Sequence, residues 1–285
     1  MNIKHKLFAI GIGSVICFST LNTFAQDVLD GVYEKQLKKE KEYVPYDPVR
    51  EADIFWSKRI FREIDVNEKM NLPFKYPRQP LIAIVHTAAM EGELTVYDPD
   101  IVQEGLERKE GYDFIKPLSV DDVKGIGART DTTTQIDPIT LEEKTVYVNQ
   151  KLEWRDIVRF RLKEDWFFDE NTSTFQVRIL GIAPVREVKS SEGIFVGYSP
   201  MYWVYYPDLR PILTKYEVYN PKNDAIRLSW EDLFEARLFT SFITKESNVF
   251  DRKIGEYVAG GIDALLESDR IKQEMFEFEH DLWTF

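Results

Sequence analysis

The sequence predicts an α+β fold in which helices are mixed with short β-sheets. Two observations lead to this prediction. In several segments apolar side chains recur at every third or fourth residue, which is the spacing of one helix face. Other segments are short runs rich in Val, Ile and aromatic residues, which favour strands. Because 44% of the 285 residues are apolar, the chain has enough material for a sizeable core.

An export signal is predicted at the N-terminus. The basic residues Lys4 and Lys6 precede a short apolar run, and Thr23-Phe24-Ala25 resembles a cleavage site. We therefore expect a cleavable signal peptide over residues 1–25 and an exported chain that begins at Gln26.

The single cysteine lies within this predicted signal. Cys17 follows Val15-Ile16 rather than the small residues that lipoprotein processing needs, so lipid attachment is disfavoured. Cleavage would leave an exported chain that folds without disulfides. It would also remove two lysines and take the formal net charge from −12 to −14. Such an acidic surface repels nucleic acids and anionic headgroups, and it suits a basic protein partner.

The exported chain is expected to have an arm and one folded domain. Residues 26–46 are polar and rich in Lys and Glu, which predicts a flexible N-terminal arm. Residues 47–285 are expected to form a single α+β domain. A first helix is predicted to begin at Asp47-Pro48, where an N-cap residue precedes a proline. Its apolar positions are Val49, Ala52, Trp56, Ile60 and Ile64.

Two later segments carry an apolar residue at every fourth position. These predicted helices contain Trp154, Val158, Leu162 and Trp166 in one case, and Trp230, Phe234, Leu238 and Phe242 in the other. Ser229 and Asp232 have the spacing of a capping box at the start of the second. Because the two stripes align, the sequence suggests an internal duplication of a helix–strand unit, with related halves at 47–129 and 150–285. Trp154 and Trp230 would then be buried in equivalent helices.

The remaining segments give simpler predictions. Strands are predicted at 81–85 and 175–180, which are runs of β-branched and other apolar residues. Residues 130–150 are expected to form a hairpin or loop between the halves. Helical spacing returns over 254–282, where Gly260-Gly261 weakens the helix.

No catalytic or metal-binding set can be assembled from the sequence. After cleavage only His86 and His280 remain, without any cysteine, and we expect both histidines to be structural. The chain lacks a nucleophile elbow and a phosphate-binding loop. Asp121-Asp122 and the pair Asp98/Asp100 keep a carboxylate glycosidase open as a third hypothesis. We nominate no catalytic, cofactor-binding or metal-binding residue and expect no cofactor.

An aromatic run from Tyr202 to Tyr206 is the clearest sequence signal for ligand binding. In a strand its side chains alternate between two faces, and one face would be able to stack sugars or anchor a partner. A periplasmic glycan-binding module is therefore the second functional hypothesis. The simpler interpretation, which we favour, is a strand buried on one or both faces.

Segments spread over the chain resemble the GldN/PorN family of the type IX secretion system in Bacteroidota. They are Trp56–Asp65, Glu68–Pro73, Glu164–Glu170, Val177–Pro184, Lys245–Arg252 and Glu279–Trp283. None of them is a general catalytic motif. The resemblance depends on their number and their order along most of the exported chain.

The resemblance implies a non-enzymatic subunit of the protein secretion machinery that also serves gliding motility in gliding species. It implies a periplasmic location at the inner face of the outer membrane, self-association in a ring, and binding to a GldK/PorK-like outer-membrane lipoprotein. Inner-membrane GldL/GldM-like components are further implied partners, and no nucleic acid is expected. Arm 26–46 and the stretch 271–285 are candidate contact segments, although docking on its own core is favoured for the second.

Overall fold

The computed structural model describes part of the chain. The described residues are 43–101, 109–110, 114–126, 129–136, 143–150, 153–190, 194–221, 223 and 225–282. The chain divides into the units Met1–Leu37 and Lys38–Phe285, and all described residues belong to the second. The predicted signal peptide and most of the predicted arm therefore lie outside the described residues. No helix in the described part is long and apolar enough to cross a membrane.

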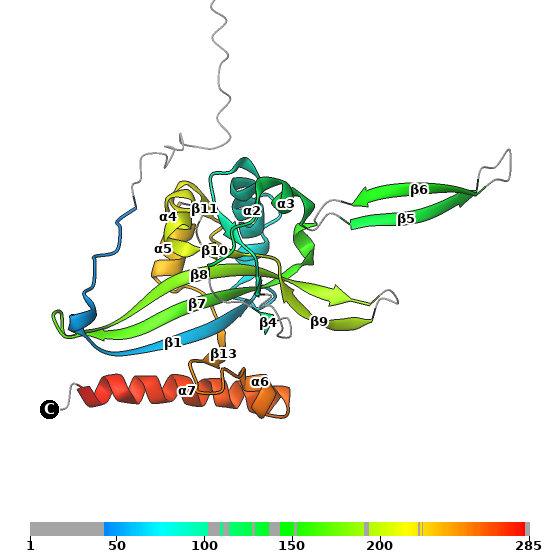
Figure 1. Cartoon of the computed structure of the whole chain (residues 1–285). Coiled ribbons are helices and arrows are strands. Elements are labelled where there is room, and N and C mark those ends of the chain that lie inside the picture. The colour runs from blue at the N-terminus through cyan, green and yellow to red at the C-terminus, as the bar shows by residue number, and fades with distance from the viewer. Residues whose placement is uncertain are drawn as a thin grey trace, which may run out of the picture. The chain divides into compact units, whose positions relative to one another are not determined.

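The second unit confirms the predicted α+β class (Figure 1). Its main sheet is antiparallel, with six strands in the order β13-β1-β7-β8-β10-β2 and a seventh, β9, paired with β8. These strands are β1 (Ile54–Asp65), β2 (Val96–Tyr97), β7 (Ile157–Asp169), β8 (Thr174–Lys189), β9 (Phe195–Pro200), β10 (Trp203–Tyr205) and β13 (Phe242–Glu246). Strands from both predicted halves thus share one sheet.

Helices and short ladders complete the unit. The α-helices are α2 (Leu81–Glu91), α3 (Val120–Gly125), α4 (Tyr206–Lys215), α5 (Trp230–Glu235), α6 (Ile254–Tyr257) and α7 (Gly261–Leu282). The 3-10 helices are η2 (Glu51–Asp53), η3 (Leu72–Lys75) and η4 (Trp154–Asp156). The two-stranded ladders are β3 (Asp100–Ile101) with β4 (Lys109–Glu110), β5 (Arg129–Ile136) with β6 (Glu143–Gln150), and β11 (Glu217–Val218) with β12 (Leu228–Ser229). Residues 130–150 were expected to form a hairpin or a loop, and the β5–β6 ladder decides for the hairpin.

The helices predicted from Asp47-Pro48 and from Trp154 are wrong, because both segments form long strands after a single 3-10 turn. Residues four apart share one face of a helix, but four is also a multiple of the two-residue repeat of a strand. The spacing of Trp56, Ile60 and Ile64 therefore fits either structure. Cross-strand pairing of β1 with β7 along nearly their whole length decides for the strand.

The strand predicted at 81–85 is also wrong, because this apolar run begins helix α2. The helix continues through Ala88 and Ala89 and ends at Gly92, whose φ of 78° is left-handed. A glycine adopts that conformation without strain, and it commonly ends helices. The length of the segment was the signal that the prediction missed. The stretch that is compatible with a helix runs for 11 residues, which is longer than most strands.

The proposed duplication fails at the two tryptophans. Trp230 begins helix α5 and is fully buried, and the predicted capping box of Ser229 and Asp232 is present. Trp154 lies in η4 and is only half-buried. The two tryptophans therefore do not occupy equivalent helices, and the segments that follow them differ as well.

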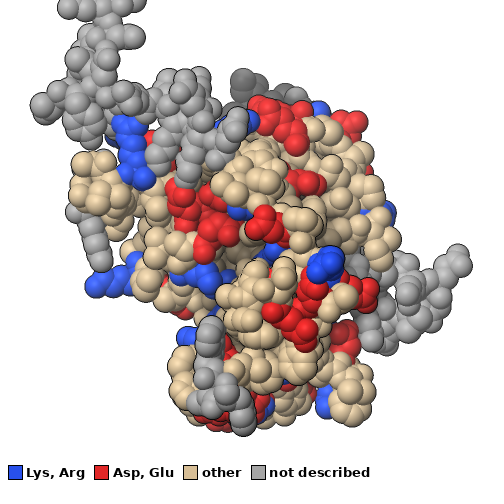
Figure 2. Space-filling model, turned by 90° about the vertical axis from the view of Figure 1, so that its left-hand side faces the viewer, with Lys and Arg blue, Asp and Glu red and all other residues tan. Residues whose placement is uncertain are grey.

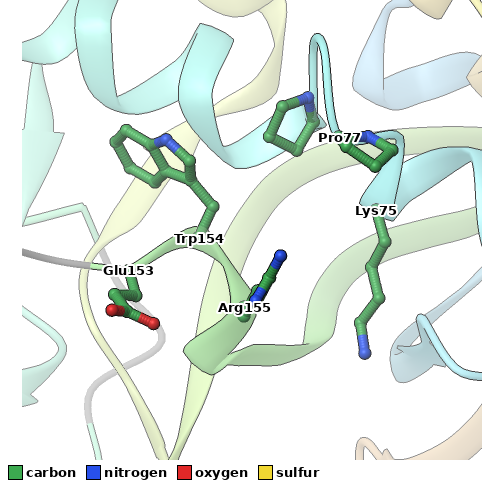
Figure 3. A pocket seen from close by; sticks show the side chains of 6 residues that line it. Lys75, Pro77, Glu153, Trp154 and Arg155 are labelled. Carbon is green, nitrogen blue, oxygen red and sulfur yellow. The ribbon is translucent and has the colours of Figure 1, made fainter.

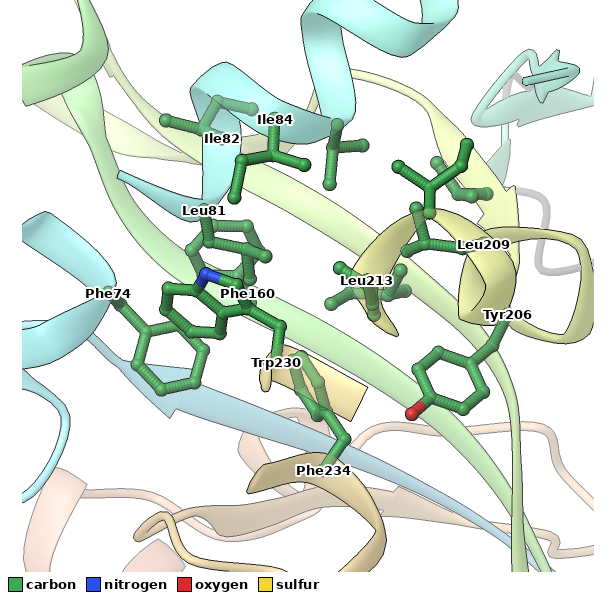
Figure 4. Close-up of a cluster of buried hydrophobic side chains, with 14 of the residues drawn as sticks. Phe74, Leu81, Ile82, Ile84, Phe160, Tyr206, Leu209, Leu213, Trp230 and Phe234 are labelled. Atoms are coloured by element: carbon green, nitrogen blue, oxygen red, sulfur yellow. The ribbon is translucent and has the colours of Figure 1, made fainter. Parts of the chain in front are cut away.

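The main core lies between the sheet and helices α2, α4 and α5 (Figure 4). Phe74 is central to it, with its ring edge-on to Trp230 at 5.1 Å and to Phe234 at 5.9 Å. Phe160 from β7 packs on the same ring at 5.6 Å. Edge-on and tilted aromatic contacts of this kind stabilise a core beyond the area they bury.

A second apolar cluster joins the sheet to the C-terminal helix α7. It contains Ile60, Ile243, Ile254, Ile271 and Met275. Phe278 adds a ring contact with Trp56, with centroids 4.9 Å apart. The favoured expectation that the stretch 271–285 docks on its own core is thus confirmed for its residues up to 282.

A buried ionic group separates the two clusters. Ile60, Arg62 and Ile64 alternate onto one face of β1, and Ile60 belongs to the α7 cluster whereas Ile64 belongs to the main core. Arg62 between them lies near Glu164, which is fully buried and accepts hydrogen bonds from Arg237 at 2.7 Å. Because this carboxylate is paired, it divides the apolar face without leaving a lone buried charge.

Candidate interaction surface

The predicted histidines are not brought together. His86 is buried in α2, where its Nδ1 lies 3.3 Å from the hydroxyl of Tyr202 and its ring contacts Trp154 edge-on. Burial lowers the pKa of His86. His280 is exposed on α7. Across the described residues, no three His, Cys, Asp or Glu side chains are close enough to hold a metal ion.

Asp98, Asp121 and Asp122 of the candidate carboxylate pairs have ordinary structural roles, and the side chain of Asp100 lies outside the described part of the structure. Asp122 forms a capping box with Ser119 at the start of α3, and these hydrogen bonds lower its pKa. Asp121 is exposed and pairs with Lys124. Asp98 pairs with Lys116 at 2.8 Å. The lowered pKa of Asp122 is the opposite of the raised pKa that a glycosidase acid needs.

The aromatic run does not form a sugar-binding face. Tyr202, Trp203 and Tyr206 are at most 1% exposed, and Tyr206 starts helix α4 rather than extending the strand. Tyr205 is half-buried, with its ring edge-on to Phe114 at 5.3 Å. The run is therefore part of the core, and the glycan-binding hypothesis loses the residues on which it depended.

A pocket of about 700 Å³ opens beside Trp154. Its walls are Lys75, Pro77, Pro80, Glu153, Trp154 and Arg155. In Figure 3, Arg155 points toward Pro77 and the indole of Trp154 lies against a neighbouring helix. The lining combines apolar rings with charges of both signs, but it contains no paired nucleophile and base.

The most distinctive surface feature is the loop between β13 and α6. Its centre is Asn248, whose side-chain nitrogen donates to the carbonyls of Glu246 at 2.9 Å and Arg252 at 2.8 Å. Its side-chain oxygen accepts from the backbone N–H groups of Phe250 at 3.2 Å and Arg252 at 3.0 Å. Asp251 adopts a left-handed φ of 53° and pairs with buried Lys245. One side chain thus ties the loop into a single conformation.

This fixed loop holds two apolar side chains in solvent. Val249 is 97% exposed and Phe250 is 71% exposed. The guanidinium of Arg252 lies 4.4 Å from the Phe250 ring and 5.9 Å from the ring of half-exposed Tyr257. Two bare apolar residues on a rigid loop are typical of an interaction site rather than of a solvated turn.

Helix α7 adds a second apolar stripe beside this loop. Tyr257 donates a hydrogen bond to Glu267 of α7, which links the α6 turn to that helix. Ile262, Leu265 and Leu266 are at least 50% exposed and lie about opposite the buried Ile271. We call Val249, Phe250, Tyr257, Ile262, Leu265 and Leu266 the loop–helix surface.

Comparison with known families identifies the chain. The sequence matches the family described as "Gliding motility associated protein GldN" over residues 49–284. The chain belongs to the GldN family. No curated protein shows a significant match. Family membership associates the chain with gliding motility and type IX secretion, and the matched range includes the whole loop–helix surface.

The GldN-family chain also shows how its N-terminal segment meets the folded unit. Residues 43–46 of the predicted arm are described, and the Tyr46 hydroxyl donates to Glu235 at 2.5 Å. The guanidinium of Arg210 lies 4.0 Å from the Tyr46 ring and 5.4 Å from that of Tyr43. The last residues of the arm are therefore part of the packed surface.

Among the described residues on the face shown in Figure 2, charges of both signs are mixed. Sequence reasoning recognised the segment 245–252 as family-like but missed that it exposes Val249 and Phe250. The hydrogen bonds that hold the loop depend on Asn248 and on backbone groups, and spacing rules do not describe them. For α7 a signal was present, since its apolar residues occupy two opposite faces of one helix.

Proposed function

We propose that this chain is a non-enzymatic structural subunit of the type IX protein secretion machinery. It acts in the periplasm at the inner face of the outer membrane, where it forms a ring complex with a GldK/PorK-like outer-membrane lipoprotein. In this proposal it is required for protein secretion and, in gliding species, for gliding motility. Contacts with inner-membrane GldL/GldM-like components belong to the same proposal.

The observation that carries the proposal is the Asn248 loop. A loop that is already rigid loses little conformational entropy when a partner covers it, so its apolar side chains contribute more fully to affinity. Phe250 on this loop and the adjoining Tyr257 are the aromatic anchors that dominate many interfaces. Family membership supports the same interpretation, because the match covers nearly all of the described residues.

The surroundings of the loop–helix surface indicate the kind of partner face it fits. Helix α7 carries seven acidic residues and two basic ones outside its histidine. Apolar residues beside an acidic rim fit an apolar groove with basic residues along its edge, because opposite charges favour the correct docking. We therefore assign the lipoprotein contact to the loop–helix surface.

Co-purification from detergent-solubilised outer membranes tests this assignment. The wild-type chain should bring the lipoprotein with it in a fixed ratio. A double variant with Val249→Ser and Phe250→Ser should recover at least about tenfold less, since it loses more than about 1.4 kcal/mol of binding free energy. Its thermal unfolding should match that of the wild type because both side chains are exposed.

Ile226→Ser is the matched control, since Ile226 is 59% exposed and lies outside the loop–helix surface. It should bind as the wild type does. If the double variant recovers as much lipoprotein as the wild type, the contact lies on another surface. Absence of the lipoprotein from the wild-type sample would contradict the scaffold function itself.

A further inference from the structure

The main sheet protects two of its strand edges with other parts of the chain. At the β13 edge, Ser268 of α7 accepts the backbone N–H of Ile243 at 2.7 Å. At the β2 edge, the carbonyl of Val96 accepts the N–H of Leu118 at 2.8 Å. Covering edges in this way prevents a sheet from pairing with other strands.

The edge of β9 lacks such protection among the described residues. It pairs with β8 on one side only. Phe195 is 51% exposed and Val196 is 66% exposed, and the strand contains no charged residue. An uncharged, apolar and uncovered edge is the type of edge that accepts another strand.

The geometry of β9 shows which backbone groups are available. Met201 donates to Pro184 on β8 at 2.9 Å, and Pro200, Ser199 and Tyr198 pair in turn with the next three β8 residues, so that Ser199 lies opposite Arg186 and Tyr198 opposite Glu187. Bonded pairs alternate along an antiparallel ladder, so Ser199 turns its backbone toward β8 and Tyr198 turns its backbone outward.

Tyr198 is also held in place by its side chain. The guanidinium of Arg159 lies 3.8 Å from the centroid of its ring, and Arg159 is fixed by Glu63 at 3.0 Å. The outward N–H and C=O groups of Tyr198 are thus part of a rigid template. A rigid template lowers the entropic cost of strand addition.

A suitable strand exists elsewhere in the same chain. The β5–β6 hairpin has a continuous ladder from Arg129–Gln150 to Ile136–Glu143. No third strand joins it within the described part of the chain. A two-stranded hairpin alone is marginally stable in water, so it gains from pairing with a further strand.

We propose that the β9 edge of one copy of this chain pairs with the β5–β6 hairpin of a second copy. The two contact surfaces differ, so the contact is heterologous, and repeated contacts of this kind produce a ring or a filament. The inference rests on the proposed scaffold function, to which it adds the contact between neighbouring copies. It is separate from the lipoprotein contact at the loop–helix surface.

Two variants of the full exported chain, beginning at Gln26, test the pairing. Tyr198→Pro removes the outward N–H, and proline is tolerated in edge strands. Tyr198→Ala is its control, because it loses the same ring but keeps the N–H. In the second variant a short Gly-Ser linker replaces residues 129–150. Sedimentation velocity should show self-association of the wild type and the alanine control, and at least a tenfold weaker association of the proline and linker variants.

Mixing the two deficient variants gives the decisive result. The proline variant keeps its hairpin and the linker variant keeps its β9 edge, so together they should form a one-to-one dimer that neither forms alone. Absence of this dimer, or wild-type association by the proline variant, would overturn the proposal. A wild-type chain that stays monomeric at every concentration would do the same.

Two further measurements distinguish a failure of strand pairing from misfolding of a variant and from a failure of the proposed lipoprotein contact. Val196→Lys places a charge on the exposed edge and serves as the edge variant if the proline variant does not fold. Co-purification of the lipoprotein by each variant reports the proposed function separately. If the wild type binds the lipoprotein but does not self-associate, the strand-pairing proposal is wrong and the proposed scaffold function is unaffected.

Discussion

Single side chains in the main core determine much of the stability of this molecule. Trp230 is fully buried, whereas Trp154 is half-buried at the edge of a pocket. Trp230→Ala should lower the free energy of unfolding by about 3–5 kcal/mol, the usual range for a buried aromatic residue. Trp154→Ala should lower it clearly less. Denaturant unfolding of both variants checks this, and equal losses would contradict the difference in burial.

His86 should make stability depend on pH in a predictable direction. Burial lowers its folded-state pKa, whereas the unfolded chain has the ordinary value near 6.5. As pH falls below about 6.5, the unfolded state takes up a proton that the folded state does not, so stability falls until the lowered pKa is reached. Well above pH 6.5, His86 is neutral in both the folded and the unfolded chain, so it no longer makes stability depend on pH.

A comparison of His86→Phe with the wild type isolates this contribution. The difference between their unfolding free energies should change in favour of the variant as pH is lowered from 7 toward 5. Exposed His280→Phe should follow the wild-type pH dependence. Parallel curves for wild type and His86→Phe would show that His86 does not titrate on unfolding.

At the scale of elements, α7 acts as the cover of the β13 edge. Ser268 is 4% exposed and accepts the Ile243 N–H, so its hydroxyl satisfies a backbone donor that α7 shields from water. Ser268→Ala should lower the free energy of unfolding by about 1–3 kcal/mol, because a buried donor is left unpaired. Asp269→Ala, at the exposed neighbouring position, should change it by less than about 0.5 kcal/mol. Thermal and denaturant unfolding measure the stability of both variants. Equal losses for Ser268→Ala and Asp269→Ala would contradict the role of Ser268 in covering the β13 edge.

At the scale of the whole molecule, the N-terminal segment can be divided at Tyr43. A chain that begins at Tyr43 keeps the contacts of Tyr43 and Tyr46 with Arg210 and Glu235. We expect it to melt as a chain that begins at Gln26 does. A chain that begins at Asp47 loses a hydrogen bond to a charged group and three cation–π contacts, two with Arg210 and one with Arg178, so it should be less stable by about 1–3 kcal/mol.

Calorimetry of the two truncated chains distinguishes a packed segment from a spacer. Co-purification of the proposed lipoprotein partner with the same two chains tests whether residues 43–46 contribute to assembly. If the chain beginning at Asp47 is as stable as the other, the Tyr46 contacts add nothing to the fold.

Some features of this protein were determined by the sequence alone. The α+β class, the C-terminal helix and the capping box at Ser229 all follow from local signals. Such signals suffice because turns, caps and long amphipathic helices are decided by residues near one another in the chain. The family was recognisable for a similar reason, since its segments keep their order along the chain.

Only the tertiary structure decided the rest. Trp56, Ile60 and Ile64 share one face in a helix and in a strand alike, and pairing of β1 with the distant β7 makes the choice. The same holds for the candidate surfaces. Distant segments of the chain decide whether Phe250 lies in a core or in water, and they also decide whether the β9 edge is covered. Such long-range contacts leave no periodic pattern in the sequence.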